Sequence, residues 1–510
     1  MAGNPPAALG PARALFVDDA LIGRSRGLRR KWHPLRKPLS RPVLIPLAPW
    51  EGTGLQAIGL VRRDPADGLF KMWYSTGTGN GQDWLTRTLV CYATSIDGIH
   101  WDRPSLGIHS FRGVRENNII AAPCIPEGTK WRFGPFSNTV NPHDSRHPHK
   151  ALVFSFNADK HSRRVRHASG TYLMTSSDGL HWRESPRPLW YLADGFGDGP
   201  RLAYDADKRR YIGFLKVYED SEGRPLRRQV AGGVLKSLIR DKNDAWVELA
   251  RHPNLVRRRA VTLTDDLVHW SEPRYILPTD DRDAPGDQTY THVAWPYESM
   301  YLGWLTMYHT RTRGRWVAGS QHIEAIFSRD GEDWHRPDDR TVMLPPGMLD
   351  RDWDYGSPFF MSQSPPIRVG DELWFYYNSV KCLHAPDGRG DSGFTCVGLA
   401  TIRVDGFASM DAPRAGGTLL MRPMKAAGNR LCLNADAGGG VAVGRILVEI
   451  RDVAGRPLRG RRFADCIPVD RDAARIEVTW RAKAAAICGR VVRLAFKMNS
   501  ASLYSVWTEP

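Results

Sequence analysis

The sequence has few cysteines, and nothing in their spacing pairs them. Their number is odd and no two of them form a CxxC pair, as the full set shows: Cys91, Cys124, Cys382, Cys396, Cys432, Cys466 and Cys488. This usage favours reduced, mostly buried thiols over a disulfide framework or a zinc site. We therefore predict a cytoplasmic protein with no metal and no cofactor.

Long apolar runs are also missing. No run approaches the roughly 18 residues that a membrane span needs, and the N-terminal stretch MAGNPPAALGPARALFVDD lacks the basic and apolar regions of a signal peptide. We expect no membrane partner and no signal peptide. The motifs HExxH, the P-loop, GxGxxG after a strand and GxSxG are absent as well.

Negative charge is in the minority, and the formal net charge is +16. The arginines are scattered, and no basic segment carries interleaved aromatic residues or a known nucleic-acid module, so we predict no nucleic-acid partner. The excess is typical of a basic surface, or it attracts an anionic substrate. Both interpretations stay open.

What the sequence does contain is a repeated segment. YATSIDGIHW ends at Trp101, LMTSSDGLHW at Trp182, TLTDDLVHW at Trp270 and AIFSRDGEDW at Trp334. Each follows two strand-like runs joined by a tight turn, and a fifth, degenerate copy without the tryptophan follows PPIRVGDELWFYYNS. In the three copies that contain Asp-Gly, the short polar residue and Asp should cap a turn that Gly permits through a positive φ, and in all four copies Trp should pack between neighbouring units. These Asp residues are therefore interpreted as structural.

Helical periodicity is almost absent between Leu60 and Met424. Four antiparallel strands repeated five times are typical of a five-bladed β-propeller, which we predict for residues 1–424. Alternating strands without the repeated segment follow, and we predict a β-sandwich at residues 425–510. The sandwich would stabilise the protein, form a homo-oligomer or bind carbohydrate. The fold class is thus all-β.

Propeller geometry places a functional site where the first strand of each unit begins. Acidic residues stand just before four of these strands: Glu51, Asp198, Asp287 and Asp354, with Asp352 beside the last. Carboxylates gathered in a cleft raise one another's pKa and can divide into an acid and a base, as glycoside cleavage requires. Acids are also common turn residues, so for any single one the structural interpretation remains open.

Polar and aromatic side chains should share this mouth. The candidates for substrate binding are Tyr290, His292, Trp353, Tyr355, Lys216, His309, Arg201 and Asn378, with Tyr74, Trp84, Tyr218 and Lys381 at similar positions. Aromatic platforms beside carboxylates suit sugar rings. A lone histidine such as His292 is more often a core residue than a metal ligand.

The five strand pairs and the segments TSIDGIHW, TSSDGLHW and FSRDGEDW resemble the five-bladed propeller glycosidases, the β-xylosidases, arabinanases and invertase-like enzymes. The resemblance covers about four fifths of the chain, and the C-terminal strands look like the accessory domain of the invertase-like group. It implies a carboxylate in the first blade, for which LFVDDALI offers Asp19. The chain lacks the Asn-Asp-Pro-Asn-Gly motif of invertases and the third-blade Glu.

Three functions remain open. The first is a glycoside hydrolase acting on a small glycoside or oligosaccharide. The second is a glycoside phosphorylase of the same fold, with Arg201 and Lys216 available for phosphate. The third is a non-catalytic propeller that binds carbohydrate or protein.

Overall fold

The computed structural model describes residues 7–52, 54–77, 88–122, 131–157, 170–191, 199–219, 256–310, 319–380, 382–383, 395–438, 444–481 and 483–510. These residues form strands and turns without a helix, so the fold is all-β, as predicted. Within them, nothing helical has the length and hydropathy to cross a membrane. The chain divides into two compact units. Unit 1 comprises residues 1–35, 368–373 and 402–510, and unit 2 comprises residues 36–367 and 374–401.

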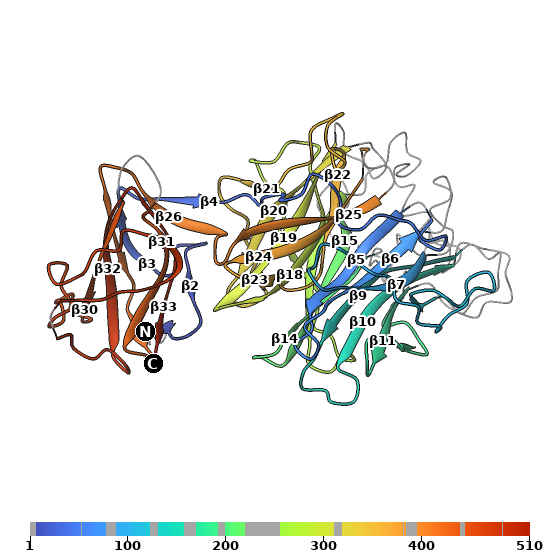
Figure 1. Cartoon of the computed structure of the whole chain (residues 1–510), viewed down its shortest axis with the longest axis horizontal. Coiled ribbons are helices and arrows are strands. Elements are labelled where there is room, and N and C mark those ends of the chain that lie inside the picture. The colour runs from blue at the N-terminus through green and yellow to red at the C-terminus, as the bar shows by residue number, and fades with distance from the viewer. Residues whose placement is uncertain are drawn as a thin grey trace. The chain divides into compact units, whose positions relative to one another are not determined.

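Unit 2 repeats one antiparallel meander along the chain (Figure 1). The first set is β5 (Gly54–Arg63), β6 (Phe70–Gly77), β7 (Thr88–Ser95) and β8 (Ile119–Ala121). The second is β9 (Trp131–Val140), β10 (His149–Asn157), β11 (Gly170–Ser176), β12 (Arg183–Glu184) and β13 (Trp190–Tyr191). The third is β14 (Arg201–Asp205), β15 (Arg210–Glu219), β16 (Val256–Thr264) and β17 (Arg274–Ile276). The fourth is β18 (Gln288–Tyr297), β19 (Met300–Thr310), β20 (Gly319–Ser328) and β21 (Val342–Leu344).

The last set is closed by residues from the start of unit 2. It contains β22 (Ser357–Met361), β23 (Ile367–Val369), β24 (Glu372–Val380) and β25 (Thr395–Arg403). Arg36 pairs with Thr401 and Leu44 with Val397, so residues 36–44 run antiparallel beside β25. An outer strand supplied from the other end of the unit explains why the fifth copy of the repeat lacks its tryptophan segment.

The first strands of the sets contact one another in a closed succession. β5 contacts β9, β9 contacts β14, β14 contacts β18, β18 contacts β22, and β22 contacts β5. A closed ring of first strands is the arrangement that a β-propeller requires. The count of five blades stays our interpretation, and this ring is the observation that supports it.

Buried polar side chains join the first strands within this ring. The Asn138 Oδ1 accepts a hydrogen bond from the Leu60 backbone N–H at 2.7 Å, and the Ser137 Oγ accepts one from the Leu202 N–H at 2.8 Å. A side chain at Gly59 would place its Cβ only 2.5 Å from Asn138 Oδ1, so the close approach requires glycine. Buried hydrogen bonds of this kind favour one arrangement of the strands.

The repeated segment forms the same turn each time, as predicted. In the first copy, Ser95 Oγ accepts the Gly98 N–H at 2.8 Å, and Asp97 Oδ1 accepts the Ile99 and His100 N–H groups at 2.8 Å. Gly98 has a φ of 75°. The same bonds recur around Asp178, Asp266 and Asp330. The four Asp residues therefore cap turns, and the structural interpretation is confirmed.

The tryptophans that end the first, third and fourth segments pack toward the preceding set of strands, whereas Trp182 contacts Phe136 and His149 of its own set. Trp101 contacts Tyr376 at 5.6 Å between ring centroids, Trp270 contacts Trp190 at 4.8 Å, and Trp334 contacts Phe214 at 5.8 Å. Trp101 and Trp334 are buried, whereas Trp182 and Trp270 are half-buried. The expected burial holds fully for two of the four.

Unit 1 has two sheets that draw on both ends of the chain. One contains β1 (Ala7–Leu9), β3 (Ile22–Arg26), β27 (Gly417–Met421), β28 (Met424–Ala426), β30 (Arg445–Arg451) and β32 (Val491–Asn499). The other contains β2 (Ala14–Leu15), β4 (Arg29–Trp32), β26 (Ala408–Ala412), β29 (Arg430–Asp436), β31 (Asp472–Glu477) and β33 (Ala501–Glu509). One apolar cluster takes side chains from both sheets, and we interpret the unit as a β-sandwich.

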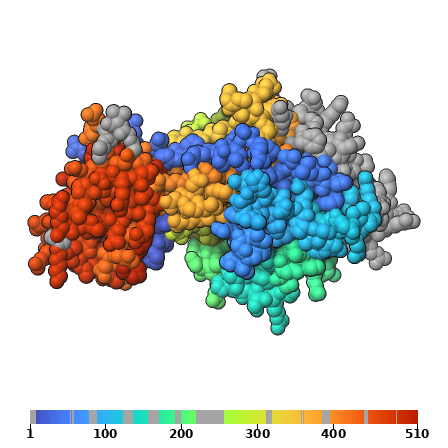
Figure 2. Space-filling view, viewed as in Figure 1, coloured from blue at the N-terminus to red at the C-terminus, as the bar shows by residue number. Residues whose placement is uncertain are grey.

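The division between the units differs from the predicted boundary at residue 424. The N-terminal strands lie in unit 1, where Figure 2 shows their residues in blue among the red C-terminal ones. Arg13 bonds the buried Asp405 at 3.1 Å, and Phe16 is wholly buried in the apolar cluster. Pairing between residues some 400 positions apart leaves no periodic signal, so strand patterns alone could not place these strands.

Candidate active site

Glu51 precedes β5, as expected, and is wholly buried against Arg103. Its carboxylate accepts hydrogen bonds from Arg103 Nε at 2.7 Å and Nη2 at 3.0 Å, and from the Tyr74 hydroxyl at 2.7 Å. It also accepts the backbone N–H groups of Leu47 and Ala48. Burial above all raises the pKa of Tyr74, which keeps its hydroxyl a donor. With five donors and no exposed surface, Glu51 anchors a loop.

Asp354 precedes β22 and is likewise buried in an ion pair. Its Oδ2 lies 2.6 Å from Lys37 Nζ and accepts the Tyr377 hydroxyl at 2.8 Å. The Tyr377 ring stacks on Trp353 with centroids 5.8 Å apart. Burial, followed by the charge of Asp354, raises the pKa of Tyr377. Lysine and tyrosine thus occupy one oxygen of this carboxylate, which is 2% exposed.

Asp287 precedes β18 and has a different set of partners. Its Oδ1 lies 2.7 Å from His309 Nδ1, and its Oδ2 accepts the Ala284 backbone N–H at 3.1 Å. His309 Nε2 lies 2.7 Å from His322 Nδ1, and His322 Nε2 lies 3.1 Å from Glu324 Oε1. We call Asp287, His309, His322 and Glu324 the Asp–His–His–Glu array. It runs across β18, β19 and β20, which lie side by side in Figure 1.

The array reaches solvent through its first histidine. The His309 side chain is 32% exposed, whereas the side chains of Asp287 and Glu324 are 7% and 3% exposed. A β-bulge lies at the start of β18, where the register shifts between Thr289 and Thr291. Bulges at the start of a strand redirect side chains and are frequent beside active sites. The Asp287 carboxylate is therefore shielded from solvent, while its hydrogen-bond partner His309 is partly exposed.

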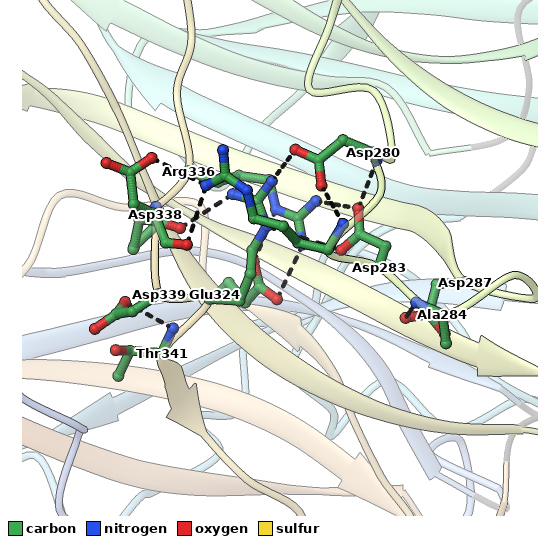
Figure 3. Close-up of polar contacts among 12 residues, drawn as sticks. Asp280, Asp283, Ala284, Asp287, Glu324, Arg336, Asp338, Asp339 and Thr341 are labelled. Carbon is green, nitrogen blue, oxygen red and sulfur yellow. Dashed lines mark hydrogen bonds and ion pairs between the residues drawn. The ribbon is translucent and has the colours of Figure 1, made fainter.

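Arg336 closes the outer end of the array. Its guanidinium donates to Glu324 at 2.8 Å from Nε and to both oxygens of Asp283 at 2.7 Å, as Figure 3 shows. Burial lowers the pKa of Arg336, but the hydrogen bonds that its guanidinium donates to Asp283 and Glu324 outweigh burial and raise the pKa overall. The Nε atom of Arg340 lies 3.9 Å from Asp283 Oδ1. Glu324 is thus held by a permanent cation.

Two further predicted residues lie elsewhere, and a third falls outside the part of the chain that the structure describes. Asp19 belongs to unit 1, where it is exposed and pairs with Arg30, so it is not in the unit where the resemblance placed it. Asp198 lies outside the described residues. Asn378 is wholly buried, accepts the Ile58 N–H at 2.9 Å and donates to the Leu55 carbonyl at 2.7 Å. Its amide joins β24 to β5 and so ties the last set of strands to the first.

The predicted basic residues Arg201 and Lys216 lie on the third set of strands together with Arg257 and Arg259, which were not predicted from the sequence. Arg201, Lys216, Arg257 and Arg259 are each at most 9% exposed, and Lys216 stands opposite Arg259 in the register of β15 and β16. We call these four residues the basic cluster. His292 of β18 lies beside it, its ring 4.8 Å from that of Phe214.

His292 is 1% exposed, and neither of its ring nitrogens has a hydrogen-bond partner among the described residues. Burial, followed by the charges of Arg259 and Arg201, lowers the pKa of His292 well below its ordinary value. His292 is therefore a neutral imidazole beside strongly basic groups. Within the described residues, no three His, Cys, Asp or Glu side chains are arranged to hold a metal ion.

The predicted aromatic residues fall into separate groups. Tyr290, at the bulge of β18, packs on Tyr308 at 5.6 Å, and the Arg257 guanidinium lies 5.2 Å from its ring. Tyr355 is half-buried beside Asp354, and Tyr218 is buried on β15. Trp84 and Lys381 lie outside the described residues.

Several residues of the site were not predicted from the sequence. His322 and Glu324 stand two positions apart in the segment GSQHIEAIF, and Arg336 follows the last repeated tryptophan by two residues. Alternate residues of a strand share one face, so the pair of polar residues within an apolar strand was the available signal. No such sequence signal existed for Lys37 and Arg103, because each lies in a loop that is distant in sequence from its carboxylate partner.

Comparison with known proteins gives only distant matches. No protein-family model and no curated protein sequence matches the chain. Among solved structures, it is similar to an N-acetylgalactosamine deacetylase from F. plautii, with 14% identity and a TM-score of 0.45 over 75% of this chain and 97% of the other.

Two further matches are described as glycosidases. A protein described with the GH130 family of mannoside phosphorylases and hydrolases matches with 13% identity and a TM-score of 0.41, over 73% of this chain and 94% of the other. A fructofuranosidase from Schwanniomyces occidentalis matches with 10% identity and a TM-score of 0.39, over 91% and 96%. The chain is thus similar to carbohydrate-active enzymes, at a level that assigns it neither an activity nor a substrate.

Proposed function

We propose that the chain is a glycoside hydrolase that cleaves a small glycoside or oligosaccharide with a pair of carboxylates, one of which is Asp287. The observation that supports this choice is the Asp–His–His–Glu array. Glu51, Asp354 and Asp19 are each paired with a lysine or arginine side chain. Asp287 is instead paired with a partly exposed imidazole, which can exchange a proton with its surroundings.

In this proposal Asp287 takes up or gives a proton at the scissile bond. A carboxylate sheltered from water and bonded to an imidazole can hold either protonation state, and acid–base catalysis requires both in turn. Asp198, just before β14, is the second carboxylate. Tyr290 and Trp353 supply the aromatic surface against which a sugar ring packs.

The test is a screen of aryl glycosides and oligosaccharides followed by substitution. On the best substrate, we expect Asp287→Asn to keep the folded structure and to lose about 10²- to 10⁴-fold in turnover, the usual contribution of a general acid or base. Asp338→Asn is the matched control, because that carboxylate is 94% exposed near the same loop. Near-normal turnover by Asp287→Asn would overturn the proposal, and binding of sugars without turnover would favour a binding protein.

A second candidate function is a glycoside phosphorylase, and the basic cluster favours it. Four cationic side chains and a neutral histidine on facing sheets would suit an anionic co-substrate such as inorganic phosphate. The same screen, run with and without phosphate, separates the two functions. Release of sugar phosphate only when phosphate is present, and its loss in Lys216→Gln, would establish the phosphorylase.

A further inference from the structure

The Asp–His–His–Glu array uses every nitrogen of its two imidazole rings. Three hydrogen bonds join four groups in line: Asp287 to His309 at 2.7 Å, His309 to His322 at 2.7 Å, and His322 to Glu324 at 3.1 Å. The two rings are 4.5 Å apart between centroids. Each of these hydrogen bonds needs one proton between its two heavy atoms.

Two neutral imidazoles cannot supply three protons. A neutral imidazole carries one N–H and one bare nitrogen, and an ionised carboxylate carries no proton. If both carboxylates were ionised and both rings neutral, each ring would donate to its own carboxylate. Two bare nitrogens, those of His309 and His322, would then face each other at 2.7 Å. The spacing therefore requires one additional proton in the array.

The surrounding charges favour that extra proton. Asp287, Glu324, Asp283 and Asp280 contribute four carboxylates around the array and its outer end. Arg336 and Arg340 contribute two cations, and Arg257, which donates to the neighbouring Gln288, contributes a third. The excess of negative charge favours a bound proton, because an opposite charge within a few ångströms stabilises the charged form.

We propose that the array holds three protons, so that His309 and His322 share one imidazolium charge that moves between them. When the central proton is on His309 Nε2, the charge lies beside Asp287. When that N–H bond breaks and an N–H bond forms at His322 Nδ1, the charge lies beside Glu324. One proton crosses 2.7 Å, and no other bond changes.

This charge shift deepens the proposed function and rests on it for its catalytic meaning. An imidazolium at His309 stabilises an ionised Asp287, whereas its transfer to His322 leaves a neutral ring beside Asp287, which is still ionised but has lost the neighbouring positive charge. Asp287 can then take up a proton from the substrate or from water, and return of the charge to His309 favours release of that proton. One carboxylate could thus serve as base and as acid in the two halves of a reaction. His322 and Glu324 are positioning residues here, because they act on the substrate only through Asp287.

The proton count can be measured without any substrate. The full chain is labelled with ¹⁵N-histidine, and nitrogen spectra near neutral pH are recorded for the wild type, His309→Gln, His322→Gln and His269→Gln. The variants assign the signals. His269 is the matched control, because it pairs with Asp266 at 2.7 Å in an exposed turn that has no second imidazole.

We expect three N–H protons on the two wild-type rings near neutral pH, one more than two neutral imidazoles carry. The proton count is read from the wild-type spectrum, so it does not depend on the folding of a variant. Two neutral rings with one N–H proton each would overturn the proposal.

The result is independent of the activity screen. A three-proton array together with full turnover by Asp287→Asn would refute the proposed function and leave the array intact. With a substrate in hand, His322→Gln should change the pH profile of turnover, whereas His269→Gln should leave the profile unchanged. If the pH profile of turnover were unchanged in both variants, the array would have no role in catalysis.

Discussion

Replacing Glu51 tests whether this carboxylate has a structural or a catalytic role. Glu51→Gln keeps the size of the side chain but removes the charge that faces Arg103, and the guanidinium of this side chain, which is 17% exposed, then lacks its counter-ion. Breaking a buried ion pair from one side costs roughly 3–5 kcal/mol. The glutamine carbonyl still accepts some of the five hydrogen bonds, so we expect the lower end, about 3 kcal/mol.

The assay is thermal unfolding followed by tryptophan fluorescence. The signal reports mainly on unit 2, because only Trp32, Trp480 and Trp507 belong to unit 1. At about 2 °C or more per kcal/mol for a domain of this size, the transition should fall by roughly 6 °C. Asp352→Asn is the control, since that acid also precedes a first strand but lies with Arg351 at the surface, and it should leave the transition unchanged.

The opposite outcome would refute the structural interpretation of Glu51. A Glu51→Gln variant with wild-type unfolding but without turnover or sugar binding would place the carboxylate in the site. A loss of stability together with retained specificity would establish it as a loop anchor.

Three other expectations follow from the same geometry. Trp334→Ala should lower the free energy of unfolding by about 3–5 kcal/mol through cavity formation, and Trp182→Ala by less because Trp182 is half-buried; equal losses in denaturant titrations would contradict this. Asn378→Leu should cost about 1–3 kcal/mol for each backbone group left without a partner and should leave ligand specificity unchanged, which unfolding and binding measurements can check together. The hydrogen bond from Lys150 lowers the pKa of Asp144 to about 2. Because the pKa of Asp144 is lowered on folding, the stabilisation by its ionised form is complete above about pH 4 and is lost as the pH falls toward 2. In acid unfolding experiments, Asp144→Asn should therefore be less stable than the wild type near neutral pH and equally stable near pH 2.

The local features of unit 2 could be predicted from the sequence. Ser95, Asp97, Gly98 and Trp101 form a turn whose hydrogen bonds span at most three residues, so neighbours in the sequence are sufficient to specify it. The all-β class follows in the same way from the period of the strands. Strand pairing between adjacent runs requires only short connections, which sequence patterns record well.

The roles of the acidic residues could not be predicted in this way. Glu51, Asp287 and Asp354 occupy equivalent positions in the sequence, each just before a first strand. They differ only in their partners, which are Arg103, His309 and Lys37. Whether a carboxylate anchors a loop or remains available for a proton depends on the charge beside it.

The sequence by itself determined the repeated turn, the strand-rich class and the positions at which acids approach the first strands, because each depends on residues a few positions apart. The tertiary structure decided the rest. It placed the N-terminal strands in unit 1, gave residues 36–44 to the last set of strands, and brought His309, His322 and Glu324 into line behind Asp287. Contacts between distant segments form only when the chain closes on itself, and the environment that sets each side chain's chemistry arises at that step.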